Sequence, residues 1–292
     1  MISAIIPVSD PRYLENQMEL LKYQEIKQLI ILDSSLQIKN NIPNDKRITI
    51  IEENSFDHGV TRNKGAKLSS YPILLFMTQD AKPFGEEFAR EIIKSIDEKI
   101  KGVYGKHLTT NQANLFERIE RKFVYPDEKI IKFQGYNFKD IFVSNVCFAV
   151  ESRTFEELGG FPEGVICSEE LVLSKKILSN GFSIMYNPKI TVIHQHDEKT
   201  SEIFKRWFDV GVAFSKNPTI SSKFRSHALK LALFVFLIIL KEKPKLIPEL
   251  TKRYVTRGLA IEIGKRHKLL KAAGVDLKKI SNNKNFWLKF DR

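Results

Sequence analysis

Short apolar runs alternate with predicted helices through the first 105 residues, and this alternation constrains the fold more than any other feature. The runs SAIIPV, KQLIILD, RITIIEE, PILLFMT and GVYG have the length of strands, and helices are predicted over residues 14–23, 61–69 and 86–99. Strands that are apolar along their whole length are typical of parallel sheets covered by helices on both faces. The sequence therefore predicts an α/β domain with a mainly parallel central sheet.

The rest of the chain adds further strands and then becomes helical. DIFVSNVCFAV, FSIMY and TVIHQH are predicted strands, and a helix is predicted over residues 169–180, where Gly181 ends it. Everything after Lys199 is predicted to be helical. With 292 residues, of which 42% are hydrophobic, the chain can form one large domain or two smaller ones.

Positive charge is concentrated in the last third of the chain. Residues 199–292 carry a formal net charge of +15, whereas residues 1–198 carry −3. A basic segment on a nearly neutral body indicates an anionic partner, either membrane lipid or nucleic acid. A nucleic-acid binder is expected to interleave basic and aromatic residues across a recognisable module. The charge here flanks an apolar helix instead, so no nucleic-acid partner is predicted.

The apolar helix in question is LALFVFLIIL, residues 231–240, followed at once by KEKPK. Ten apolar residues are too few to span a bilayer, but beside lysines they are typical of a helix lying in the membrane interface. The alternatives are a buried helix and a homodimer interface. The two cysteines, Cys147 and Cys167, suit a reducing compartment, and we expect no signal peptide in MISAIIPVSD. The expected location is the cytoplasmic face of the cell membrane.

Acidic side chains lie at the ends of two predicted strands. Asp33 ends LIILD, and Asp80 follows ILLFMTQ. Parallel sheets bind their ligands at the carboxyl edge of the strands, where a carboxylate can hold a divalent cation. At such an edge Asp80 can hold Mg²⁺ or Mn²⁺. On the local sequence alone, the favoured roles are a cap on the turn after Asp80 and an Asx turn at Asp33.

The segment FDHGVTRNKGA joins a strand to a helix. Gly59 permits close approach of a ligand, and Thr61 is predicted to cap the helix. Backbone N–H groups at a helix N-terminus attract phosphate, and Arg62 can add a charge-assisted contact. The alternative is a solvated arginine on a surface helix.

Two adjacent acids, Glu169 and Glu170, open the predicted helix after Ser168, its expected N-cap. Acids in a first turn are also favoured by the helix dipole alone. A carboxylate within hydrogen-bond reach of a hydroxyl can remove its proton, so this pair can supply a general base. The dipole is expected to lower the pKa of these carboxyls.

Two histidines, His194 and His196, alternate along TVIHQH and so share one face of the strand. Such a pair can ligate a metal, and His194 is the predicted ligand. The alternative is one buried, hydrogen-bonded histidine with the other near the substrate. In FKRWFDVGV, core packing is the favoured role of Trp207.

In this order, these segments resemble the inverting glycosyltransferases of family 2 with the GT-A fold, and most closely the rhamnosyltransferase-like branch. The resemblance covers residues 2–212. It rests on AIIPV, LDSS, FDHGVTRNKGA, LLFMTQDA, VYGKH, FVSNVCFAV, ELGGFPEG, SEELVLSKKILSNGF, VIHQH and FKRWFDVGV. Thr78 replaces the first acid of the family's Asp-X-Asp metal motif, as is common in this branch. Glu170 stands where the family has the aspartate of a Glu-Asp pair.

The resemblance implies a GT-A fold with a Rossmann-like sheet. Residues 1–217 would form the catalytic domain, of which 1–105 bind the nucleotide sugar and 106–217 the acceptor. Residues 218–292 would form a basic amphipathic helical tail. The resemblance also implies Glu170 as the general base, with Glu169 binding the acceptor or positioning the loop, and Asp80 as a metal ligand. The prediction of His194 as a further ligand rests on the spacing of the two histidines. The resemblance places ten residues at the donor: Pro7, Asp33, Ser35, Asp57, His58, Arg62, Asn63, Gln79, Asp80 and Arg206.

The activity that the resemblance implies is metal-dependent transfer of a sugar with inversion. The expected donor is dTDP-rhamnose, which would supply L-rhamnose to a cell-surface polysaccharide or a lipid-linked glycan. The alternatives are a family member that uses a UDP-hexose and a subunit that binds nucleotide sugars without catalysis.

Overall fold

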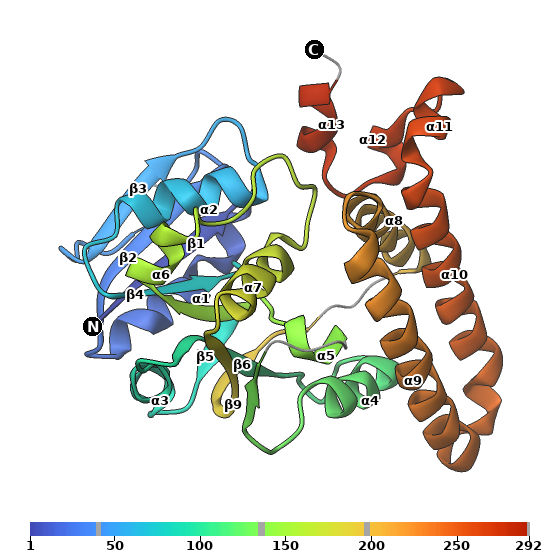
Figure 1. The fold of residues 1–292 in the computed structure, drawn as a ribbon, viewed down its shortest axis with the longest axis horizontal. Helices are drawn as coiled ribbons and strands as arrows, with labels where there is room; N and C mark the ends of the chain where they lie inside the picture. Colours follow the sequence, from blue (N-terminus) through green and yellow to red (C-terminus); the bar gives the residue numbers. More distant parts are fainter. Residues whose placement is uncertain (39–41, 134–137, 196–198, 291–292) are drawn as a thin grey trace.

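The computed structural model describes residues 1–38, 42–133, 138–195 and 199–290 (Figure 1). In this part of the chain nine strands form one mixed, mostly parallel sheet, ordered β3-β2-β1-β4-β8-β6-β9-β5, with β7 beside β9. Strand β1 is parallel to β2 and β4, β2 is parallel to β3, and β6 is parallel to β9. The predicted α/β class is confirmed. The strands are β1 (Ile2–Val8), β2 (Ile26–Asp33), β3 (Ile48–Glu52), β4 (Ile73–Met77), β5 (Lys82–Phe84), β6 (Ile100–Leu108), β7 (Ile130–Lys132), β8 (Cys147–Glu151) and β9 (Ser183–Ile193).

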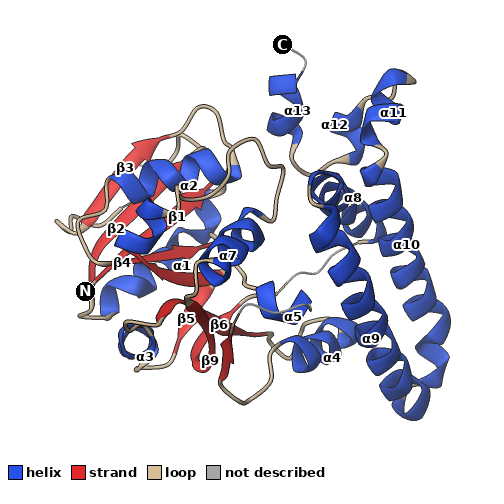
Figure 2. Ribbon diagram, in the orientation of Figure 1, coloured by secondary structure: helices blue, strands red, loops and turns tan. Residues whose placement is uncertain are grey.

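The helices divide into those that cover the sheet and those that lie beside it. Figure 2 shows the strands gathered in one half of the molecule and only helices in the other. The helices are α1 (Leu14–Met18), α2 (His58–Lys67), α3 (Phe88–Ser95), α4 (Leu115–Val124), α5 (Phe138–Ile141), α6 (Ser152–Glu157), α7 (Glu169–Ser179), α8 (Thr200–Lys216), α9 (Pro218–Glu242), α10 (Ile247–Lys265), α11 (His267–Ala272), α12 (Leu277–Ile280) and α13 (Lys284–Phe290).

The two faces of the sheet bury separate hydrophobic clusters, because successive side chains of a strand point to opposite faces. All of β1 is buried. Ala4 and Ile6 join residues of α1 and α3 on one face, while Ile5 joins residues of α6 and α7 on the other. Helix α2 lies against the Ile5 face, since a Cβ on Gly65 would come within 2.4 Å of the Ile5 side chain.

Three predicted elements differ from the structure. The helix predicted over 61–69 begins at His58. Of DIFVSNVCFAV only CFAV is a strand, at the start of β8 (Cys147–Glu151). SIMY and TVI lie in the single strand β9, because the residues between Asn187 and Thr191 are accommodated as a register shift against β6 rather than as a turn, and His194 follows the end of this strand. Gly105 allows the register shift, since a Cβ there would lie 2.4 Å from the Ile190 carbonyl oxygen.

The C-terminal helices pack tightly on one another and on the sheet domain. Helix α8 crosses α10 at two glycines: a Cβ on Gly211 would meet the Ile261 carbonyl oxygen at 2.2 Å, and one on Gly264 would meet the Phe208 carbonyl oxygen at 2.1 Å. Side chains of α4, α9 and α10 share a further buried cluster. Among the described helices, none combines the length and apolarity needed to cross a bilayer.

Candidate active site

A cavity of about 520 Å³, the sheet-edge pocket, opens at the carboxyl ends of β1, β2 and β4. This is the edge at which parallel sheets bind ligands. Several predicted donor residues line it, but Ser34 lines it in place of its neighbours Asp33 and Ser35. The lining residues are Pro7, Val8, Ser9, Ser34, Phe56, Asp57, His58, Arg62, Thr78, Gln79, Asp80, Val165, Ile166 and residues 282–286.

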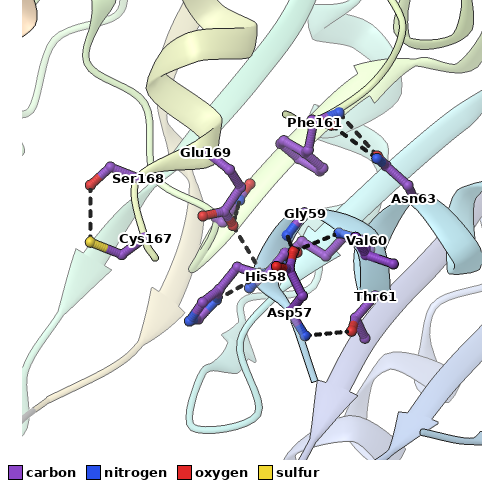
Figure 3. Close-up of polar contacts among 12 residues, drawn as sticks. Asp57, His58, Gly59, Val60, Thr61, Asn63, Phe161, Cys167, Ser168 and Glu169 are labelled. Atoms are coloured by element: carbon purple, nitrogen blue, oxygen red, sulfur yellow. Dashed lines mark hydrogen bonds and ion pairs between the residues drawn. The ribbon is translucent and has the colours of Figure 1, made fainter. Parts of the chain in front are cut away.

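Asp57 fixes the start of α2 beside the pocket. Its Oδ1 accepts hydrogen bonds from the N–H groups of Gly59 and Val60, both at 3.0 Å, and its own N–H donates to the Thr61 hydroxyl at 3.2 Å (Figure 3). The N-cap is therefore Asp57, and the prediction that Thr61 caps the helix is wrong. The capped first turn places His58 and Arg62 at the pocket.

A buried ion pair joins α2 to α7. Arg62 Nη1 lies 3.0 Å from Glu169 Oε1, and both side chains are almost fully buried. The same oxygen accepts from Asn145 Nδ2 at 2.8 Å. Arg62 Nη1 also contacts the carbonyl oxygen and Nδ1 of His58, at 3.1 and 3.2 Å. Arg62 thus holds Glu169 as well as lining the pocket.

The two neighbouring acids have opposite pKa shifts. Burial is the largest single effect on Glu169 and favours its neutral form. The charges of Arg62 and His58 together with the hydrogen bonds from the backbone and from Asn145 outweigh burial, and the net effect lowers the Glu169 pKa. Burial and the charge of Glu169 raise the pKa of Glu170 to about 8. The expected lowering by the helix dipole is therefore wrong for Glu170, because desolvation and a like charge next door are the larger effects.

Asp80 lines the sheet-edge pocket and is in direct contact with His194. His194 Nε2 lies 3.3 Å from Asp80 Oδ2, and the His194 side chain is buried. Burial lowers the His194 pKa, so its ring is neutral. Arg121 Nη2 donates to Nδ1 at 3.3 Å, which leaves the proton on Nε2, facing Asp80. His194 in this arrangement is a hydrogen-bond donor to Asp80.

These contacts decide which residues fit a metal ion. Asp80 offers carboxylate oxygen, the ligand that Mg²⁺ and Mn²⁺ prefer, and it lines the pocket. His194 fits as the group that orients Asp80, since Nε2 would have to lose its proton to bind the ion directly. No cluster of three or more potential metal-ligating side chains occurs in the described residues. The second predicted histidine, His196, lies outside those residues.

Four predicted donor residues have polar contacts that serve the fold. Asp33 accepts hydrogen bonds from the backbone of Ser35 and two following residues and from the Ser35 hydroxyl, which is the Asx turn that the local sequence favours. Gln79 binds the backbone N–H groups after β1 through its Oε1. Asn63 pairs with both backbone groups of Phe161, at 2.9 and 3.0 Å (Figure 3). That any of these four residues contacts a nucleotide-sugar donor stays a prediction.

A second cavity, of about 670 Å³, lies between the sheet domain and the C-terminal helices; we call it the helix-lined cavity. His194 lines it, while its partner Asp80 lines the sheet-edge pocket, so this pair stands between the two cavities. Arg206 lines the helix-lined cavity, not the sheet-edge pocket. The exposed surface of the helix-lined cavity is mainly apolar, and its lining includes Tyr125, Phe142, Trp207 and Phe224.

Residues 282–286 were missed by the sequence reasoning, although they form one side of the sheet-edge pocket. They carry no acid or recognisable motif, and they lie more than 200 residues along the chain from Asp80. The basic character of this third of the chain is the one sequence signal near them, and by itself it indicates only an anionic partner.

Comparisons with known proteins show which proteins the chain is similar to. No protein-family model matches the chain. The chain is 32% identical to the O-antigen chain rhamnosyltransferase WbaN of Salmonella anatum over 250 residues, 82% of this chain and 79% of that protein. It is 30% identical to the O-antigen chain rhamnosyltransferase RfbN of Salmonella typhimurium over 280 residues, 90% of this chain and 89% of that protein.

Two solved structures share the fold at lower sequence identity. The mannosyltransferase PcManGT of Pyrobaculum calidifontis, in complex with GDP-Man and Mn²⁺, matches with a TM-score of 0.55 and 14% identity, over 94% of this chain and 75% of that one. Residues 1–349 of TarS from S. aureus match with a TM-score of 0.55 and 14% identity, over 99% and 91%. TarS was also solved in complex with UDP-GlcNAc.

Proposed function

Since the chain belongs to the rhamnosyltransferase-like branch of the family 2 glycosyltransferases with the GT-A fold, we propose that it transfers L-rhamnose from dTDP-rhamnose to a growing O-antigen chain. The sheet-edge pocket carries this proposal, because its lining brings together Asp80, the capped start of α2 and Arg62, which pairs with Glu169 behind the lining. The alternatives are a UDP-hexose donor and an inactive subunit that binds nucleotide sugars.

The donor diphosphate is proposed to lie in the sheet-edge pocket with Asp80 as ligand of Mg²⁺ or Mn²⁺. The ion would supply positive charge to balance the diphosphate as it leaves. The hydrogen bond from His194 holds the Asp80 carboxylate in one orientation. The Mn²⁺ in the structure of the mannosyltransferase that shares this fold supports the use of a divalent ion.

Glu170 is proposed to act as general base. Its carboxylate takes the proton of an acceptor hydroxyl while that oxygen bonds to the anomeric carbon. The bond from this carbon to the diphosphate oxygen breaks, the nucleoside diphosphate leaves, and the configuration inverts. The ionised Glu169 next to it makes Glu170 a stronger base, which is why its raised pKa suits the role.

The acceptor glycan is proposed to enter from the helix-lined cavity, which meets the sheet-edge pocket at the Asp80–His194 pair. Flat aromatic side chains such as Trp207 and Phe142 suit the apolar faces of sugar rings. Arg206 lines this cavity, so we propose that it contacts the acceptor side of the reaction centre.

The experiment is a transfer assay with purified protein, Mg²⁺ or Mn²⁺, and an O-antigen acceptor. dTDP-rhamnose is compared with UDP-glucose, UDP-GlcNAc and GDP-mannose, and nucleoside diphosphate release and glycan mass are measured. Rhamnose addition from dTDP-rhamnose alone supports the proposal. Transfer from a UDP-sugar identifies the alternative donor, and binding of nucleotide sugars without turnover identifies the inactive subunit.

A membrane-surface contact is proposed for α9, which contains the apolar stretch of residues 231–240. This stretch has apolar side chains both on the face that packs against the protein and on the face that is exposed. Val235 and Ile239 are buried against α4 and α10. The other face leaves large apolar side chains exposed at a helical spacing, next to exposed Lys230, Lys241 and Lys243. These side chains are Leu229, Leu233, Phe236, Leu237 and Leu240.

Substitution on this face tests the contact without disturbing the fold. Leu233→Glu with Leu237→Glu should abolish co-flotation with vesicles that contain anionic lipid. Leu269→Glu is the matched control, because Leu269 is 69% exposed but lies on α11. Equal flotation of both variants would refute the contact at α9.

A further inference from the structure

The end of the described chain, residues 281–287, forms a wall of the sheet-edge pocket; we call it the C-terminal wall. Residues 282–286 line the pocket opposite the strand ends. Figure 1 shows α13 apart from α11 and α12, on the side that faces the sheet domain. The segment thus belongs to the pocket in space, although it is far from the other lining residues in sequence.

Asp209 on α8 anchors the C-terminal wall. Its Oδ1 accepts from the Ser281 hydroxyl at 2.5 Å, and its Oδ2 accepts from the N–H groups of Asn282 and Asn283 at 3.0 and 3.2 Å and from Asn283 Nδ2 at 2.9 Å. Asp209 is buried, so these hydrogen bonds are shielded from water. Four hydrogen bonds to one carboxylate fix the backbone at the start of the wall.

Apolar burial anchors the other end of the wall. Phe286 and Trp287 are buried in a cluster with Phe208, Val212 and Ala260 of α8 and α10. Burial of two aromatic side chains removes a large apolar area from water and so stabilises this docking. The wall is therefore part of the folded body rather than a loose end.

A polar chain connects the wall to the acidic pair. His58 Nδ1 faces Arg62 Nη1, an obligate donor, so His58 Nε2 carries the proton and donates to Asn283 Oδ1 at 2.9 Å. Contacts therefore run from Glu169 through Arg62 and His58 to Asn283. The position of the wall is set by the same residues that hold the catalytic edge.

Lys284 is the lining cation of the sheet-edge pocket that is available to bind an anion. The lining cations are Arg62 and Lys284, and the charge of Arg62 is balanced by Glu169 at 3.0 Å. Lys284 is exposed and makes no ion pair in the part of the chain that the structure describes. Asp57 and Asp80 contribute negative charge to the same lining. Among the described lining residues, a diphosphate entering the pocket therefore meets one side-chain cation without an ion-pair partner, Lys284.

We propose that the C-terminal wall is a part of the donor site and that Lys284 binds the diphosphate of the nucleotide. This assignment rests on the proposed function, since it takes a nucleoside diphosphate sugar as the pocket's ligand. Asn283 sets the place of Lys284 through its contacts with Asp209 and His58. The basic tail then serves nucleotide binding as well as any surface contact of α9.

The test measures binding of dTDP, UDP and thymidine to the full-length protein with Mg²⁺ by calorimetry. Lys284→Ala should weaken binding of the preferred diphosphate about tenfold, because a charge-assisted contact to phosphate is lost. Thymidine binding should stay unchanged, and Lys284→Arg should restore diphosphate binding. Lys279→Ala is the matched control, because Lys279 is an exposed lysine of α12 outside the pocket lining.

Each outcome separates this inference from the proposed function. Diphosphate binding that is equal in wild type and Lys284→Ala overturns the inference while leaving the proposed function intact. A tenfold loss supports the inference even if rhamnose transfer is not detected. A folded wild-type protein that binds neither diphosphate overturns both.

Discussion

The pH dependence of the reaction follows from the raised pKa of Glu170. A general base works only when ionised, and burial together with the charge of Glu169 places the Glu170 pKa at about 8. About one tenth of the carboxyl is then ionised at pH 7 and about nine tenths at pH 9. We expect kcat/KM to rise about tenfold between these values, with unit slope below pH 8 and a plateau above it.

The assay is initial-rate release of nucleoside diphosphate at subsaturating donor between pH 6 and 9.5, with the acceptor in excess. Glu170→Gln removes the base but keeps the size and polarity of the side chain. It should lower the rate by a factor of about 10²–10⁴ and lose the pH dependence, while dTDP still binds. A wild-type profile that is flat or falls from pH 6 to 9 would refute Glu170 as the base.

Stability gives an independent check on the same pKa. The folded pKa lies above the ordinary carboxyl value, so the folded state holds a proton that the unfolded state releases. This group's contribution to stability is full below the ordinary pKa and is lost as pH rises to about 8. The free energy of unfolding of the wild type should therefore fall relative to Glu170→Gln between about pH 5 and 8. An unchanging difference would place the Glu170 pKa near its ordinary value.

Three further changes test the fold and the site. In Gly211→Ala the new Cβ would sit 2.2 Å from a backbone oxygen of α10, so the free energy of unfolding measured in urea should fall by about 3 kcal/mol or more. Gly258 has open space around it, so Gly258→Ala should raise the free energy of unfolding by about 0.5–1 kcal/mol. Glu169→Gln leaves its arginine partner buried without a counter-charge and should cost about 3–5 kcal/mol, against at most about 1 for Glu157→Gln in an exposed pair. Asp80→Asn should abolish the rise in Tm that Mn²⁺ and dTDP together produce in the wild type.

The fold was predictable because its determinants are local. The apolar runs of β1, β2 and β4 are buried on both faces, as uninterrupted hydrophobicity requires. Asp80 follows from the same pattern, since the strand before it fixes its place at the edge. Asp57 shows where local reasoning stops: both Asp57 and Thr61 can cap a helix, and only the backbone conformation decides between them.

The environment of the acidic pair could not be predicted, because its partners are distant in sequence. Arg62 is 107 residues from Glu169, and their pairing depends on how α2 meets α7. The sequence alone provides the helix dipole, which lowers the pKa of both acids. Burial of Glu170 and the charge of Glu169 raise the Glu170 pKa instead. Both effects depend on the tertiary structure around the pair.

The charge distribution along the chain predicts a basic tail distinct from the catalytic domain. In the structure, however, this tail packs against residues before position 217, so removing it would also disturb those residues. Helix α10 meets α8 in direct backbone contact at Gly211 and Gly264, and α9 covers side chains of α4. The C-terminal wall depends on Asp209, which lies before the predicted boundary at residue 217. Removing everything after Asn217 would expose these clusters and strip one side from the sheet-edge pocket. Loss of membrane binding in such a truncation would therefore report unfolding as readily as a lost surface contact, and only substitutions on the exposed face of α9 separate the two.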